Sequence, residues 1–168
     1  MKESIQDDFA ISAGDFFSRV YLDADYTRAL HLDGMKCVSY EVIMNKGDVL
    51  SGLERSIRSV PNVEMPKAVQ KVLGNSIAYT EVGYFDSEAQ NYRFKVLPST
   101  LQEKIRIEGL CSVEALDETC CRRICDLEFE VKVFGVGKLI EQVIRNSYVE
   151  NQKLAATFTA AWIAKHRG

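Results

Sequence analysis

The stretch Leu127-Glu128-Phe129-Glu130-Val131-Lys132-Val133 decides the fold, together with the residues that follow it. Apolar and charged residues alternate through it, which predicts a strand with one buried face. From Lys138 onward there is no Pro, and the only Gly is Gly168. Apolar residues recur there at spacings of three and four, which favours one side of a long helix: Ile140, Val143, Ile144, Leu154, Ala155, Phe158, Ala161 and Trp162. A long helix lying across the apolar face of a curved sheet can enclose a cavity.

The chain before this stretch predicts more strands and a few short helices. Ser12 is a candidate N-cap with Asp15 three residues on. We expect short helices after Ser12, over 24–30 and over 67–73. We expect strands over 4–11, 37–44, 49–60, 77–85, 90–97, 101–116 and 120–133, with Asn45-Lys46-Gly47-Asp48 as a turn. Hairpin-linked strands favour an antiparallel sheet. We therefore predict an α+β helix-grip fold, with about seven strands wrapped around a long C-terminal helix, in a single domain spanning 1–168.

Composition excludes several classes of function. Apolar residues make up 46% of the 168 residues, charged residues 27%, and the formal net charge is −3, so nothing draws the chain toward nucleic acid. No apolar run approaches the roughly 18 residues of a membrane span, and the N-terminus lacks the apolar segment of a signal peptide. We expect a cytoplasmic protein without stable membrane insertion. Its five cysteines are then reduced.

The third hairpin allows a register to be predicted. A three-residue loop over 117–119 pairs Ile107 with Phe129 and Cys111 with Cys125, and it keeps apolar residues on one face. A two-residue loop would set Ile107 against a glutamate. The two cysteines form either a redox or metal site or a pair of small apolar fillers, and we favour the fillers because free Cys is commonly buried and no His joins them.

The second hairpin leaves the direction of Glu81 open. A tight loop over 86–89 would bring Glu81 opposite Phe94, inside the sheet, where a carboxylate would be a natural polar anchor for a ligand. A loop different by one residue would put Val82 and Tyr84 inside instead. A solvated Glu81 on the outer face is the interpretation we favour.

Three other polar residues also have more than one interpretation. Arg55 and Arg58 lie on one strand and face opposite sides, so one of them could hold an anionic group at the cavity mouth, although a surface arginine explains either. His31 lies where a short helix ends, and we interpret it as a cation near the last carbonyls rather than as a catalytic base.

The aromatic and apolar residues of the inner face are ordinary core in most domains, but a sheet curved around a helix tends to leave space, and an apolar pocket with few polar anchors suits a hydrophobic ligand. Our candidate ligand-binding residues are Tyr92, Phe94, Ile107, Phe129, Val131, Leu154, Phe158, Trp162, Glu81 and Arg55. The chain lacks dinucleotide-binding, phosphate-loop, zinc-protease and nucleophile-elbow motifs. We therefore expect no cofactor, no metal and no assigned catalytic residue.

Three stretches resemble the START-like superfamily of polyketide cyclases and birch-pollen-allergen-like proteins, also called SRPBCC. They are Phe16-Phe17-Ser18-Arg19-Val20-Tyr21 with Asp25-Tyr26, Val63-Glu64-Met65-Pro66 leading to Val72-Leu73-Gly74, and Phe134-Gly135-Val136-Gly137-Lys138-Leu139-Ile140-Glu141. Within the superfamily the chain is most similar to an uncharacterised bacterial family of unknown function. Members often have a Pro near the joint before the last helix, where this chain has Phe134-Gly135.

The resemblance implies a hydrophobic cavity of the kind that the superfamily uses for lipids, sterols, polyketides and hormones. Our leading hypothesis is a protein that binds or carries a hydrophobic, lipid-like or polyketide-like small molecule. A second is a cyclase, aromatase or hydratase with Glu81, Tyr79, Tyr92 and His31 as candidate acids and bases; convergence of these residues in one cavity would favour it. A third is a protein-interaction module with a filled core.

Overall fold

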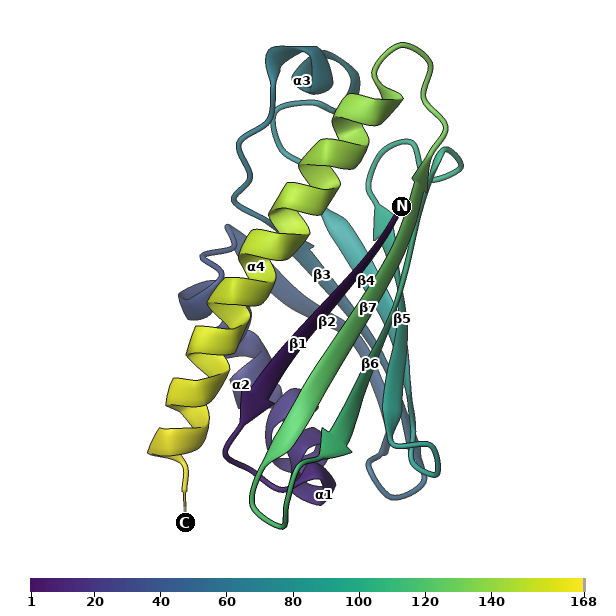
Figure 1. The fold of residues 1–168 in the computed structure, drawn as a ribbon. Coiled ribbons are helices and arrows are strands. Elements are labelled where there is room, and N and C mark those ends of the chain that lie inside the picture. The colour runs from purple at the N-terminus through teal and green to yellow at the C-terminus, as the bar shows by residue number, and fades with distance from the viewer. Residues whose placement is uncertain (168) are drawn as a thin grey trace.

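The computed structural model describes residues 1–167, which form one seven-stranded antiparallel sheet and a set of helices on its concave side (Figure 1). The strands are β1 (Lys2–Phe9), β2 (Ser39–Asp48), β3 (Gly52–Val60), β4 (Tyr79–Asp86), β5 (Asn91–Pro98), β6 (Ile105–Ala115) and β7 (Cys121–Val131). The α-helices are α1 (Ala13–Phe16), α2 (Ala24–Ala29), α3 (Lys67–Leu73) and α4 (Gly137–Lys165), and two π-helical turns, η1 (Phe17–Tyr21) and η2 (Leu30–Gly34), extend α1 and α2. The α+β helix-grip prediction is confirmed.

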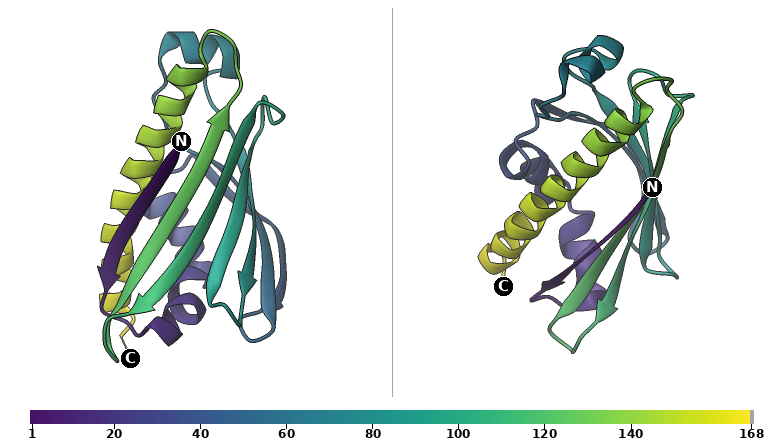
Figure 2. Two further views of the ribbon diagram at one scale, coloured as in Figure 1. Left: turned by 45° about the vertical axis from the view of Figure 1, so that its right-hand side comes forward. Right: turned by 45° about the horizontal axis from the view of Figure 1, so that its top comes forward.

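The strand order is β1-β7-β6-β5-β4-β3-β2. Strands β2 to β7 are therefore each paired with the next strand in the sequence, and β1 pairs with β7 at the other edge of the sheet. Helix α4 crosses the sheet diagonally, with α3 near its first turn and α2 near its last turns (Figures 1 and 2). No helix within residues 1–167 combines the length and the apolar character needed to cross a membrane.

The register of the third hairpin is as predicted. Ile107 pairs with Phe129 and Cys111 with Cys125, and the backbone of Leu116 bonds to Cys120 around the three-residue loop. The side chain of Ser12 caps α1 by accepting a hydrogen bond from the Asp15 amide at 3.2 Å. Both features depend on local patterns, which is why the sequence was enough to predict them.

Two predicted turns differ from the structure. Residues 45–48 do not turn but continue β2, and the chain reverses over 49–51, where the Asp48 carboxylate accepts hydrogen bonds from Leu50 and Ser51. In the second hairpin the loop lies over 87–90, one residue later than expected, so Glu81 pairs with Val96 and Gly83 with Phe94. Because both partners move by one residue, Glu81 stays on the same face of the sheet as Phe94.

Two apolar clusters occupy the space between the sheet and the helices. One lies around α1, η1 and α2 and includes Phe16, Phe17, Tyr26, Phe85 and Tyr92. The other lies under α3 and the start of α4 and includes Met65, Val69, Leu73, Ile105 and Ile140. The far end of α4 is fixed to α2 by a 2.7 Å hydrogen bond between the hydroxyls of Thr159 and Tyr26.

Two glycines on the concave face make room for aromatic rings. A Cβ atom on Gly109 would lie 2.1 Å from the Phe94 ring, and one on Gly83 would lie 1.9 Å from the Tyr92 hydroxyl oxygen. Phe94 is the register partner of both glycines. The rings therefore lie flat across the sheet only because these positions carry no side chain.

We expect Gly109→Ala to lower the free energy of unfolding by about 1–3 kcal/mol, because the new methyl group overpacks against Phe94. Gly14→Ala is the matched control: nothing lies within 4 Å of its Cβ position, and alanine is the better helix former, so stability should stay equal or rise by up to about 1 kcal/mol. Urea unfolding measures both. Equal effects in the two variants would contradict the packing argument.

Candidate ligand-binding cavity

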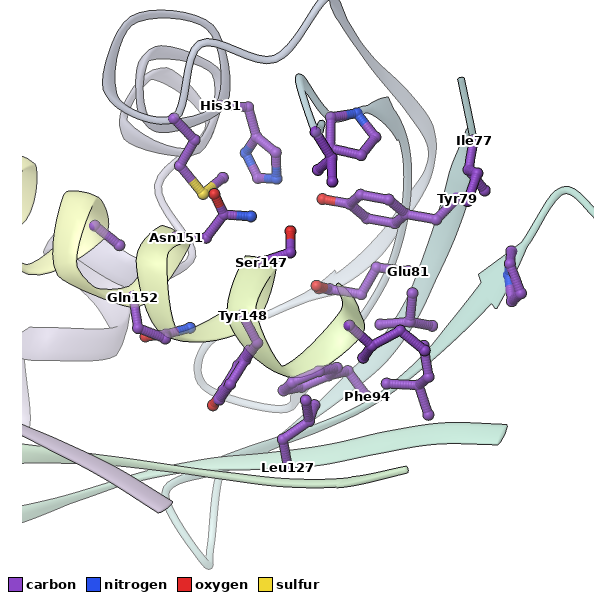
Figure 3. Close-up of a pocket in the computed structure, with 18 of the residues that line it drawn as sticks. His31, Ile77, Tyr79, Glu81, Phe94, Leu127, Ser147, Tyr148, Asn151 and Gln152 are labelled. Atoms are coloured by element: carbon purple, nitrogen blue, oxygen red, sulfur yellow. The ribbon is translucent and has the colours of Figure 1, made fainter. Parts of the chain in front are cut away.

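A cavity of about 280 Å³ lies between the concave face of the sheet and α4 (Figure 3). Its volume is near the lower end of the range of small-molecule sites, roughly 300–1,000 Å³. The walls come from β3 to β7, from α4, from η2 and from the segment around α3. Residues from both apolar clusters line it, so the cavity occupies the space that the two clusters leave between them.

One part of the wall is apolar. It consists of side chains from β5, β6, α4 and the α3 segment: Val63, Met65, Leu73, Ile77, Val96, Pro98, Ile105, Ile107, Ile140, Val143 and Ile144. None of these side chains offers a hydrogen bond, so this part can hold only the apolar portion of a ligand.

The other part of the wall is polar and is built around Arg55 and Glu81. Arg55 lies on β3 and Glu81 on β4, and one guanidinium nitrogen of Arg55, Nη2, is 3.8 Å from Glu81 Oε1. The other, Nη1, donates to the Thr27 hydroxyl at 3.1 Å and to the Tyr21 carbonyl at 3.3 Å. Only 8% of the Arg55 side chain and 16% of the Glu81 side chain is exposed. The expectation of a surface position is therefore wrong for both Glu81 and Arg55, whereas Arg58 is exposed.

Tyrosine rings surround the Arg55 guanidinium. Its central carbon is 5.0 Å from the Tyr92 ring centroid and 5.8 Å from that of Tyr21, within cation–π range. Burial disfavours the charge of Arg55, but Tyr92, Glu81 and Tyr21 outweigh it and raise its pKa. Burial and the Glu81 charge likewise raise the pKa of Tyr92, which donates its hydroxyl proton to Glu81 Oε1 at 2.9 Å. The ion pair is thus fixed from several sides.

The two π-helical turns bring Tyr21 and His31 to this region. Leu22 bonds back to the Phe17 carbonyl at 2.9 Å, and Met35 to the Leu30 carbonyl at 2.7 Å. These wide turns are often found at functional sites. Tyr21 ends η1 and supplies a carbonyl to Arg55, and His31 lies within η2 and lines the cavity.

His31 is a buried, neutral side chain. Only 7% of it is exposed, and its Nδ1 lies 2.8 Å from the Thr27 carbonyl oxygen. Burial lowers its pKa, and the Thr27 hydrogen bond only partly opposes this effect. The expectation of a cation at a helix end is therefore wrong, because burial lowers the pKa of the ring and favours its neutral form.

Further polar groups lie close to Glu81. Figure 3 shows the hydroxyls of Tyr79 and Ser147 and the amide of Asn151 on the same side of the cavity as Glu81 and His31. Burial, followed by the Glu81 charge, raises the pKa of Tyr79, so its hydroxyl stays protonated. His31, Tyr79 and Glu81 thus converge on one side of the cavity. Tyr92 is linked to this group by its hydrogen bond to Glu81.

A second buried arginine and two cysteines lie on β6 and β7. Arg123 is bonded to Asp7 of β1 at 2.5 Å, and both Arg123 and Cys125 line the cavity. The sulfur atoms of Cys111 and Cys125 are 3.5 Å apart as free thiols. The hydrogen bond with Cys111 lowers the pKa of Cys125, with Arg123 adding to this effect against burial. No metal-ligand group of three or more His, Cys, Asp or Glu occurs within residues 1–167.

The candidate residues from the sequence occupy several different places. Arg55, Glu81, Phe94 and Ile107 line the cavity. Tyr92 and Phe129 are fully buried beside it, and Val131 packs in the cluster under α3. Phe158 and Trp162 pack on Tyr26 near the far end of α4, and Leu154 is 45% exposed and outside the wall.

The polar residues that α4 contributes to the wall were not predicted from the sequence. Ser147, Tyr148, Asn151 and Gln152 line the cavity together with Ile140, Ile144 and Ala155 of the apolar stripe. Their spacings of three and four continue the apolar stripe of the first turns. The signal was therefore present, but a search for apolar residues alone passes over it.

Comparison with known proteins places the chain in a family. The profile described as "Protein of unknown function (DUF2505)" matches residues 18–163. No curated protein sequence matches the chain.

Solved structures share the fold at low sequence identity. TTHA0849 from Thermus thermophilus is 17% identical, with a TM-score of 0.64 and full coverage of both chains. The Zhui aromatase/cyclase from Streptomyces is 12% identical, with a TM-score of 0.65 over 94% of this chain and 92% of that one. Norcoclaurine synthase from Thalictrum flavum, solved with dopamine and hydroxybenzaldehyde, is 20% identical, with a TM-score of 0.60 over 100% of this chain and 90% of that one.

A START superfamily protein from Mycobacterium smegmatis also matches, at 14% identity and a TM-score of 0.56 over 96% of this chain and 98% of that one. The family match over most of the chain and the shared helix-grip fold agree with each other. The protein is therefore a member of the DUF2505 family, and it shares the helix-grip fold of the START superfamily protein.

Proposed function

We propose that the protein binds a hydrophobic small molecule, lipid-like or polyketide-like, in the cavity between the sheet and α4, and that it carries or senses this molecule. The observation that carries the proposal is the wall itself: a continuous apolar part beside a polar part whose charges are already paired. Such walls are typical of small-molecule sites. The cavity does not support the alternative of a filled interaction module.

Native mass spectrometry of the purified protein, followed by organic extraction, tests the proposal. We expect a stoichiometric adduct, or, for protein purified empty, binding of the neutral fluorescent probe Nile red. Val143→Trp places a large ring in the wall and should reduce adduct or probe binding by about tenfold or more. Gln142→Trp, on the exposed face of the same helix, is the control and should bind like the wild type.

Both variants should be checked for folding by circular dichroism. Loss of binding in both would mean that the tryptophan acts through the helix rather than through the cavity. A protein that is empty and also ignores Nile red would contradict the proposal.

Because His31 is neutral in the folded protein, we expect the stability of the protein to depend on pH. Its folded-state pKa lies below the unfolded value of about 6.5, so below that pH the unfolded chain takes up a proton that the folded chain resists. Stability should therefore fall as the pH drops from 7.5 to 5.5, by at most about 1.4 kcal/mol per pH unit from this group. His31→Gln should remove this part of the slope.

His166→Gln is the matched control, because His166 is exposed near the end of α4. Urea unfolding at several pH values between 5.5 and 7.5 measures the slopes. If His31→Gln keeps the slope of the wild type, His31 does not resist protonation in the folded protein.

Acid–base catalysis on the bound molecule is a second candidate function, favoured by the convergence of His31, Tyr79 and Glu81 in one cavity. In this arrangement neutral His31 is the base, and the protonated Tyr79 hydroxyl can polarise a carbonyl. A positioned base typically contributes 10²–10⁴-fold.

Exchange of the α-hydrogens of 2-tetralone in D₂O, followed by NMR, tests this chemistry. We expect protein-dependent exchange that His31→Gln reduces by about a hundredfold, with His166→Gln as the control. Exchange no faster than in buffer would leave binding as the function of the cavity.

A further inference from the structure

We propose that the cavity selects an uncharged ligand whose hydroxyl donates a hydrogen bond to Glu81 or His31, and that it rejects carboxylates and phosphates. This inference rests on the ligand binding proposed above and names the class of molecule bound. Its basis is the supply of donors, acceptors and charges at the polar part of the wall.

Each arginine in the wall already faces a carboxylate of the protein, Glu81 for Arg55 and Asp7 for Arg123. The cationic side chains that line the cavity are Arg55 and Arg123, and no lysine does so within residues 1–167. Arg55 faces Glu81, Thr27 and the Tyr21 carbonyl, and Arg123 is bonded to Asp7. The Nε atoms of both arginines are buried and have no hydrogen-bond partner within residues 1–167. An anion entering here would meet the Glu81 carboxylate and lose its hydration without gaining a counter-ion.

Glu81 offers one acceptor oxygen to the cavity. Its Oε1 accepts the Tyr92 hydroxyl and faces Arg55. Among residues 1–167, no hydrogen-bond donor is bonded to Oε2. Figure 3 shows the Glu81 side chain pointing into the cavity, toward the side occupied by Tyr79 and Ser147. A ligand hydroxyl can therefore donate to Oε2 without displacing a protein partner.

His31 offers a second acceptor. A carbonyl oxygen only accepts hydrogen bonds, so the 2.8 Å contact with Thr27 requires that Nδ1 carries the proton. Burial keeps the ring neutral, which leaves Nε2 as an unprotonated acceptor. The ring lines the cavity on the same side as Glu81. Two acceptors at one end of an apolar cavity call for a donor from the ligand.

The charge balance favours a hydroxyl over an ammonium group. Arg55 already neutralises Glu81, so a ligand cation would gain little attraction and would also lose its hydration. A hydroxyl loses less hydration, and its oxygen can accept in return from the hydroxyls of Tyr79 or Ser147, which lie on the same side. The rest of the ligand then lies against the apolar part of the wall.

Three probes of matched shape test the inference: 4-hexylphenol, its methyl ether 4-hexylanisole, and 4-hexylbenzoate. Each competes with Nile red for the wild-type protein at pH 7.5, where the phenol is neutral and the benzoate is ionised. We expect the phenol to bind at least about tenfold more tightly than the ether, the equivalent of one hydrogen bond, and more tightly still than the benzoate.

Glu81→Gln extends the test, because it keeps the shape of the side chain but leaves Arg55 without its carboxylate. The preference for phenol over benzoate should then shrink by about tenfold or reverse. Glu54→Gln, at an exposed position of β3 outside the wall, should keep the preference of the wild type. If Glu81→Gln does not fold, the three-probe series on the wild type still decides the matter.

The outcomes separate this inference from the proposed function. Binding of the ether as tight as that of the phenol, or binding of the benzoate as tight or tighter, overturns the selection for a hydroxyl while leaving a hydrophobic binding site. If neither Nile red nor any of the three probes binds, the proposed function fails, and this inference fails with it.

Discussion

A guanidinium group buried under the helices constrains much of this structure. Arg55 cannot lose its proton in a protein, so its charge must be matched wherever the side chain lies. The fold does this with groups from several elements: the carboxylate of Glu81 on β4, the ring of Tyr92 on β5, the carbonyl of Tyr21 in η1 and the hydroxyl of Thr27 on α2. The charge of Arg55 is matched only when all of these groups are in place together.

An ion pair of this kind is a poor source of stability. The cost of removing two charges from water roughly cancels their attraction, and apolar residues of the same volume often serve as well or better. Loss of one partner, by contrast, costs several kcal/mol because the other charge stays buried. The pair therefore constrains where β3, β4 and the η1–α2 segment lie, and it gives the cavity a polar end that packing alone would not create.

The cavity follows from how the two apolar clusters are separated. Aromatic rings from η1, α2 and β5 fill one side, and aliphatic side chains from α3, β6 and α4 fill the other. Between them Gly83 and Gly109 let the rings of Tyr92 and Phe94 lie flat on the sheet. Side chains therefore extend less far from the sheet at this point, which leaves space beneath α4. Helix α4 spans both clusters, and it contains no Pro that would kink it toward the gap.

The sequence was sufficient for the parts of the fold that depend on periodic patterns. Alternation over 127–131 and the loop over 117–119 determined the register of β6 and β7, and the stripe from Ile140 to Ala155 determined which side of α4 faces the sheet. The turn after Asp48 was missed because Asn45 and Gly47 are turn-forming types that here sit in an exposed edge strand, where tertiary pairing overrides propensity.

The candidate site was less accessible to sequence reasoning, and the cause is physical. A lone charged residue in a strand is usually solvated, so neither Arg55 nor Glu81 signals its burial from the sequence. The two are diagonal neighbours across β3 and β4, where Arg55 pairs with Gly83 and Ile57 with Glu81, and this pairing becomes known only from the structure. Aromatic content misled in the opposite direction, because Phe158 and Trp162 pack on Tyr26 beyond the cavity.

This protein shares its fold with proteins of known activity, but a shared fold does not determine what the cavity binds. The solved structures that match it include an aromatase/cyclase and norcoclaurine synthase, yet identity to each is 20% or lower. At that identity the likeness shows the fold alone, so what the cavity binds has to be argued from its own donors, acceptors and charges. Here both arginines of the wall face carboxylates of the protein, and Glu81 Oε2 and His31 Nε2 are the acceptors left for a ligand. A site of this kind leaves the apolar wall to supply affinity, and it leaves selectivity to a single polar group on the ligand.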